Sequence, residues 1–191
     1  MKIEQYVLAY RVEQDRLRAM LPEGYISLRP VLRINAEIRT GDQEIVYLEF
    51  NTPVEGHGKR GWLNIAHWEG FSYEKIRNST TFRSPFLEIT YTAIGTIGSC
   101  PAEKDNDGCF FGETFIPAEK IDANKEYSNC SFRWKFSKGD AHGISTDGKS
   151  IPAIPTEQKN LYEKQALTPE NAAAIPCEQV LGAYVVRFER I

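Results

Sequence analysis

Short β-prone runs follow one another along the chain, and turn residues separate them. In several of these runs apolar and polar positions alternate with period two, the period of a strand with one buried face. Such runs predict strands over Tyr6–Arg11, Pro30–Arg39, Glu44–Asn51, Gly61–Trp68, Phe86–Gly95, Gly108–Ile116, Cys130–Lys138 and Val180–Arg190. Many short strands with turn signals between them indicate an antiparallel sheet, either a barrel or a sandwich.

Polar residues alternate with apolar ones along one of these strands. In the segment 32–38 the side chains of Arg33, Asn35 and Glu37 share one face, and the apolar residues occupy the other. On a barrel that polar face lies wholly in solvent or wholly in the lumen. In the second case the strand brings a cation, an amide and an acid to one pocket.

Helical patterns are few. Glu13–Leu21 carries apolar residues at helical spacing, and a second helix is predicted from Thr168, which caps a helix with Pro169 at its first position, to a stop at Pro176. Ser72–Asn78 is interpreted as a further helical turn. Residues 139–165 are loop-like and are expected to form a long connection over the mouth of the barrel.

Composition narrows the class of protein. The chain has 191 residues, 41% hydrophobic and 26% charged, which predicts one soluble globular domain over residues 1–191. Its net charge of −3 disfavours nucleic acid as a partner. The apolar runs are too short for a membrane span, and the polar N-terminus does not resemble a signal peptide, so a cytoplasmic location is expected.

The four cysteines lack CxxC spacing and are expected to be reduced thiols in the cytoplasm. A bridge between Cys100 and Cys109 across a hairpin is the alternative for an oxidising compartment. The three histidines lack the spacing of metal ligands, so no metal site is predicted. No nucleotide-binding or hydrolase motif occurs, and no cofactor is predicted.

The segment from Tyr6 to Ile38 resembles the N-terminal part of the acetoacetate decarboxylase family. It has the order strand, helix, Leu-Pro-Glu-Gly break at residues 21–24, and strand from Pro30. The matching positions are Tyr10 with Arg11, Leu17 with Arg18, Pro22 with Glu23, and Pro30. The resemblance implies a mainly β, antiparallel, closed or nearly closed β-barrel with two or three short helices.

The family works through a lysine that forms a Schiff base, made nucleophilic by a neighbouring lysine and a dry pocket. The resemblance places Lys75 about where that lysine stands, without an adjacent lysine, and Arg77 two residues on could supply positive charge. An ordinary solvated lysine is the alternative.

The family's first glutamate corresponds to Asn35 by direct spacing, and to Glu37 with a two-residue shift. Glu44 is nearest to the second glutamate, and the family's arginine matches Ile3. Outward-facing strand charge is the alternative for Glu37 and Glu44. The candidate catalytic residues are therefore Lys75, Glu37 and Glu44, and the candidate ligand-binding residues are Arg33, Asn35 and Arg77.

Three functions stay open at this stage. The first is a lyase-like enzyme, resembling acetoacetate decarboxylase, that acts on a small keto acid or carbonyl compound through a lysine amine. The second is a non-catalytic barrel that binds a small apolar or anionic molecule. The third is an assembly protein that uses its barrel edges, and a homo-oligomer is open in all three cases.

Overall fold

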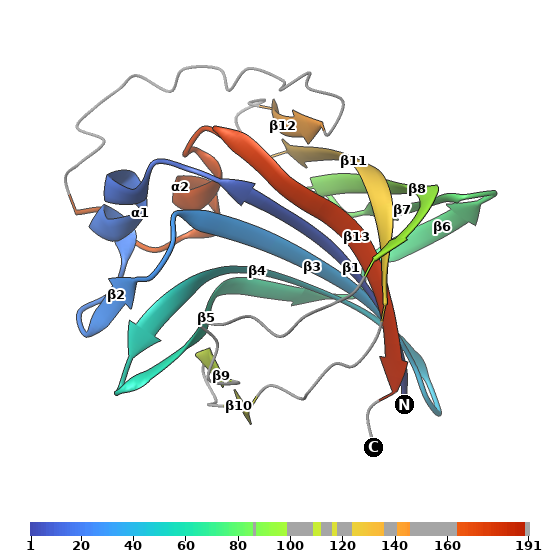
Figure 1. The fold of residues 1–191 in the computed structure, drawn as a ribbon, viewed down its shortest axis with the longest axis horizontal. Coiled ribbons are helices and arrows are strands. Elements are labelled where there is room, and N and C mark those ends of the chain that lie inside the picture. The colour runs from blue at the N-terminus through green and yellow to red at the C-terminus, as the bar shows by residue number, and fades with distance from the viewer. Residues whose placement is uncertain are drawn as a thin grey trace.

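The computed structural model describes residues 1–85, 87–98, 109–111, 116–117, 124–135, 141–145 and 164–189. In these residues the chain forms one curved sheet and two short helices (Figure 1). The strands are β1 (Lys2–Arg11), β2 (Tyr25–Ser27), β3 (Val31–Thr40), β4 (Glu44–Gly56), β5 (Lys59–Glu69), β6 (Ser72–Ile76), β7 (Ser79–Arg83), β8 (Leu87–Gly98), β9 (Cys109–Phe111), β10 (Ile116–Pro117), β11 (Lys125–Lys135), β12 (Ala141–Ser145) and β13 (Gln179–Glu189). The helices are α1 (Gln14–Met20) and α2 (Pro169–Ala173).

The strands pair in the order β10-β9-β5-β4-β3-β1-β13-β11-β8-β7-β6, with β2 beside β4 and β12 beside β11. All of these pairs are antiparallel except β5 with β9. The first and last strands, β1 and β13, pair in the middle of the sheet. The predicted mainly β, antiparallel fold is therefore confirmed, but no pairing among the described residues joins β6 to β10, and the sheet is not shown closed.

The core lies on one face of the sheet. Strand register places Tyr6 opposite Ala36 and Leu8 opposite Ile34, so these apolar side chains share a face. The sheet bends over this face until strands far apart in the pairing order meet. The Trp134 ring on β11 lies 5.3 Å from the Phe50 ring on β4 and 6.0 Å from the Trp68 ring on β5. One hydrophobic cluster thus joins both halves of the sheet.

Both predicted helices are present at one end of the sheet (Figure 1). Helix α1 buries Leu17 and Met20 against the core, as its apolar spacing predicts. Helix α2 begins where the sequence indicates, since the Thr168 side chain accepts a hydrogen bond from the Asn171 N–H at 3.2 Å. No helix in the described residues is long and apolar enough to cross a membrane.

Two local predictions need correction. Ser72–Asn78 is not a helical turn, because β6 and β7 form an antiparallel hairpin whose turn contains Arg77 with a φ of 55°. Strand β7 pairs with β6 on one side and with β8 on the other, and these pairings stabilise the segment as strand although its sequence has a weak helical pattern. Within the expected connection 139–165, Ala141–Ser145 is a strand that pairs with β11. The rest of that connection up to residue 163 lies outside the described residues, as do Gly108 and residues 112–115 of the predicted strand Gly108–Ile116.

Candidate functional site

Five buried polar side chains lie together on β3 and β4, on the face of the sheet opposite to the core. Antiparallel pairing sets Arg33 opposite Asn51 and Asn35 opposite Glu49, and the alternation of each strand keeps their apolar neighbours on the core face. Their exposed fractions are 8% or less, so none of them lies in bulk solvent. We call this group the polar cluster: Arg33, Asn35, Glu37, Glu49 and Asn51.

Hydrogen bonds connect four members of the polar cluster in a row. The Nε of Arg33 donates to Oδ1 of Asn51 at 3.0 Å. Oε1 of Glu49 accepts from the Nδ2 atoms of Asn51 and Asn35, at 3.0 and 2.7 Å. The Arg33 guanidinium also stacks on the ring of Trp62, 3.5 Å from its centroid. The amide of Asn51 thereby connects the guanidinium of Arg33 to the carboxyl group of Glu49, and Asn35 donates to the same carboxyl oxygen.

Glu37 belongs to the same face but has its own partners. Its carboxylate accepts from Nε2 of Gln5 at 2.8 Å and from Arg39 at 2.7 Å. The Arg39 ion pair supplies a counter-charge for Glu37. The Tyr47 hydroxyl donates to Oε2 of Glu49 at 3.3 Å, and so completes the contacts of that carboxyl group.

Burial raises the pKa of Glu49, because removal from water penalises the carboxylate. The charge of Arg33 opposes that increase and the charge of Glu37 adds to it, while hydrogen bonds from Asn35 and Tyr47 lower the pKa. The net pKa is higher than that of an ordinary glutamate. A buried carboxyl group with a raised pKa holds its proton to a higher pH than an ordinary glutamate does, and such groups are frequent at functional sites.

One acceptor of the polar cluster is left without a hydrogen bond. Oδ1 of Asn35 is buried and has no hydrogen-bond partner among the described residues. The same holds for Oδ1 of Asn64, which lies opposite Asn51 in the pairing of β4 with β5. Buried side-chain oxygens nearly always accept a hydrogen bond, and each exception calls for an explanation. A bound molecule with a hydrogen-bond donor would supply the missing partner.

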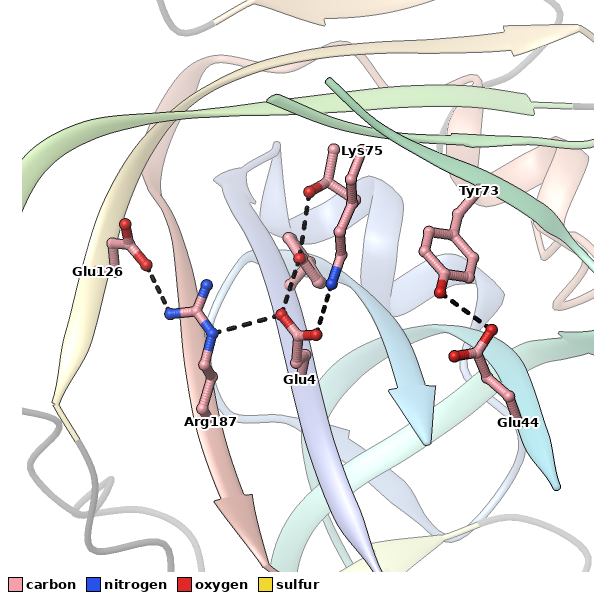
Figure 2. A network of polar contacts seen from close by, with 8 residues as sticks. Glu4, Glu44, Tyr73, Lys75, Glu126 and Arg187 are labelled. Atoms are coloured by element: carbon pink, nitrogen blue, oxygen red, sulfur yellow. Dashed lines mark hydrogen bonds and ion pairs between the residues drawn. The ribbon is translucent and has the colours of Figure 1, made fainter. Parts of the chain in front are cut away.

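Lys75 lies in a second, more exposed group of charges, which Figure 2 shows. Its Nζ is 2.6 Å from Oε1 of Glu4, and its side chain is 42% exposed. Arg187 contacts the other oxygen of Glu4 at 3.3 Å and Glu126 at 2.6 Å. We call these residues the Glu4 network: Glu4, Lys75, Glu126 and Arg187.

The charges of the Glu4 network act on the pKa of Glu4. Burial would raise that pKa, but the hydrogen bond and charge of Lys75 and the charge of Arg187 lower it overall. Close by, Glu44 accepts a hydrogen bond from the Tyr73 hydroxyl at 2.9 Å. Glu44 and Tyr73 also line an open groove of about 520 Å³ with Glu69 and Phe71.

The candidate residues from the sequence therefore fall into two places. Glu4 pairs with Ile38 and projects from the core face, whereas Gln5 pairs with Glu37 and projects from the opposite face. Lys75 and Glu44 lie at the rim of the core face, and Arg33, Asn35 and Glu37 lie on the other face. Arg77 is exposed in the hairpin turn.

Sequence analysis did not identify Glu49 and Asn51. A signal for both is present, because Tyr47, Glu49 and Asn51 alternate with apolar residues in the same way as the polar positions of β3. When the two strands pair as a hairpin around residues 41–43, the polar residues of β4 lie opposite those of β3 on the same face. Among the described residues, no group of three or more His, Cys, Asp or Glu side chains is placed to hold a metal ion.

No protein-family model matches the chain, and no curated protein matches it by sequence. Solved structures match it over nearly its whole length. Acetoacetate decarboxylase from Legionella pneumophila superposes with a TM-score of 0.50 and 12% identity, over 98% of this chain and 81% of that enzyme. An acetoacetate decarboxylase-like enzyme from Sphingomonas wittichii gives a TM-score of 0.51 and 10% identity, over 97% and 87%.

The enduracididine biosynthesis enzyme MppR is a third match, with a TM-score of 0.52 and 10% identity over 97% of this chain and 82% of MppR. MppR has also been solved in complex with pyruvate. At these identities the likeness concerns the fold and not the chemistry. The chain thus has the fold of the acetoacetate decarboxylase-like enzymes, as the segment from Tyr6 to Ile38 indicates.

Proposed function

We propose that this protein binds a small carboxylic acid at the polar cluster, with Arg33 facing the ligand's carboxylate and Glu49 lying beside it. The observation that carries the proposal is the buried Glu49, whose pKa is raised and which the amide of Asn51 connects to Arg33. A raised pKa means that Glu49 carries its negative charge less readily than an ordinary glutamate, so it opposes a negatively charged ligand less.

Two further facts support an acid as the ligand. Guanidinium groups match carboxylates in geometry and charge, and the stacking of Arg33 on Trp62 fixes its orientation in advance. MppR, which has the same fold, binds pyruvate, a small carboxylic acid. The fold thus accommodates a ligand of this class in at least one protein.

The enzyme hypothesis, in which Lys75 attacks a small keto acid, stays a prediction. In the Glu4 network the amine would first have to leave its 2.6 Å contact with Glu4. The polar cluster lies on the other face of the sheet, so Glu37, Arg33 and Asn35 could assist Lys75 only after a rearrangement. We therefore rank binding at the polar cluster above lysine chemistry.

Calorimetric titration with acetate, propionate, pyruvate, lactate and acetoacetate tests the proposal. We expect at least one of these acids to bind, and Arg33→Met to weaken its binding by about ten-fold or more, since a charge-assisted hydrogen bond is lost. Met keeps an apolar stem against Trp62. Arg133→Met, on an exposed position of β11, is the matched control and should bind like the unaltered protein.

Two results would contradict the proposal. One is that none of the five acids binds. The other is that binding is unaffected by Arg33→Met and is lost in Lys75→Met, which would move the site to the Glu4 network.

A further inference from the structure

The amide of Asn35 has one orientation that fits its surroundings. Its Nδ2 donates to Oε1 of Glu49 at 2.7 Å, and the same oxygen also accepts from Asn51. Turning the amide over would place Oδ1 against a carboxyl oxygen that already accepts from Asn51, which is unfavourable while that oxygen carries no proton. In the structure Nδ2 of Asn35 faces Glu49, and its Oδ1 points away from that oxygen.

Among the described residues, no donor on this face reaches Oδ1 of Asn35. Asn51 donates to Glu49, Gln5 and Arg39 donate to Glu37, and the Tyr47 hydroxyl donates to Glu49. Asn35 is 0% exposed, so bulk water does not reach its Oδ1. A buried acceptor without a donor lowers stability, and a ligand that donates to it recovers that loss on binding.

We infer that the ligand of the polar cluster carries an O–H or N–H donor next to its carboxylate, as a small hydroxy acid or amino acid does. The inference rests on the proposed function and adds the chemical class of the ligand. The carboxylate would face Arg33 and the donor would face Oδ1 of Asn35. A keto acid offers only oxygen acceptors at that position, and a carbonyl oxygen there would repel Oδ1.

The spacing of the two side chains suits a small molecule. Arg33 and Asn35 are two residues apart on one face of β3, which separates their Cα atoms by about 6.6 Å. Because both side chains leave the strand on the same face, one small molecule lying over that face can contact both of them. Larger acids are not required to reach both groups.

A matched series of three-carbon acids tests the inference in the unaltered protein. Lactate and alanine each carry a donor at the second carbon, pyruvate carries a carbonyl there, and propionate carries neither. We expect calorimetry to show lactate or alanine binding about ten-fold or more tightly than pyruvate and propionate, because only these two satisfy Asn35.

A variant then assigns the preference to Asn35. Asn35→Leu removes the acceptor at similar volume and should reduce the difference between lactate or alanine and propionate to less than about three-fold. Asn129→Leu, on an exposed position of β11, is the matched control and should keep the full difference.

The outcomes separate the inference from the proposed function. Equal binding of all the acids, or tighter binding of pyruvate, overturns the donor requirement and leaves acid binding in place. Binding by none of them overturns both. A preference that survives in Asn35→Leu also overturns the inference, and if that variant does not fold, the series on the unaltered protein decides.

Discussion

At the scale of single residues, Glu49 differs most from an ordinary surface side chain. It is buried on β4, it accepts from two amides and a hydroxyl, and its pKa is raised. The folded protein therefore holds a proton on Glu49 more tightly than the unfolded chain does, for which the reference pKa is 4.5. The contribution of this difference to stability is complete below the unfolded pKa and is lost as pH rises through the folded pKa.

Replacing Glu49 by Gln should make stability less dependent on pH. The amide keeps an oxygen for Asn35 and Asn51 but cannot ionise, so it avoids the cost of a buried carboxylate above pH 4.5. As pH rises, we expect the free energy of unfolding of Glu49→Gln to increase relative to that of the unaltered protein. The increase should be about 1.4 kcal/mol for each unit by which the pKa of Glu49 is raised. Urea unfolding at several values between pH 4 and 8 measures this.

Glu55→Gln is the matched control, because Glu55 is exposed on the same strand. Its free energy of unfolding should run parallel to that of the unaltered protein over the whole pH range. Parallel curves for Glu49→Gln as well would mean that Glu49 ionises in the folded protein as easily as in the unfolded chain.

Lys75 is the residue on which lysine chemistry depends. Treatment with borohydride in the presence of pyruvate or acetoacetate reduces any imine to a stable adduct, which peptide mass spectrometry locates. We expect no more adduct at Lys75 than at Lys135, since the two side chains are 42% and 43% exposed and each lies near a glutamate. A strong adduct at Lys75 that Lys75→Arg abolishes would contradict this and support the enzyme hypothesis.

At the scale of elements, period-two alternation and capping signals predicted most of what the structure contains. Strands β1, β3, β4, β5 and β13 overlap predicted strands, and α1 and α2 lie where Leu17 and Thr168 indicate. The β6–β7 hairpin was not recognised, because its exposed edge strand lacks alternation and its pairing with β8 decides its conformation. Local sequence carries little of that information.

The site was predictable to the extent that it depends on one strand. The shared face of Arg33, Asn35 and Glu37 follows from alternation alone. Glu49 joins them only through the register between β3 and β4, which was not worked out from the sequence. The separation of Lys75 from Glu37 depends on the bend of the whole sheet, which brings β6 over the core face of β1.

Helix α1 should contribute to stability mainly through Leu17. This side chain is 0% exposed and packs into the main core, so Leu17→Ala leaves a cavity. We expect the free energy of unfolding to fall by about 2–5 kcal/mol. Arg18→Ala, on the exposed side of the same helix, removes only an ion pair with Asp15 and should cost about 0.5 kcal/mol or less. Equal losses in urea unfolding would contradict the packing of α1.

At the scale of the whole molecule, the bend of the sheet makes one core from strands that are distant in the pairing order. Trp134 on β11 packs against Phe50 on β4 and Trp68 on β5, and it is 1% exposed. The two halves of the sheet bury their apolar faces against each other. We therefore predict that they unfold together as one domain.

Trp134→Ala tests this prediction, because the substitution and the remaining fluorescent tryptophans lie in different halves of the sheet. The variant keeps only Trp62 and Trp68, both on β5, so its fluorescence reports on one half of the sheet while the substitution lies in the other. We expect a loss of about 3–5 kcal/mol, with the fluorescence and far-ultraviolet circular dichroism midpoints coinciding in urea. Arg133→Ala, on the opposite face of β11, should shift neither midpoint appreciably. The contradicting result is a fluorescence midpoint equal to that of the unaltered protein together with a lower circular dichroism midpoint. The two halves of the sheet would then be separate folding units, and a single core would not account for the stability of the sheet.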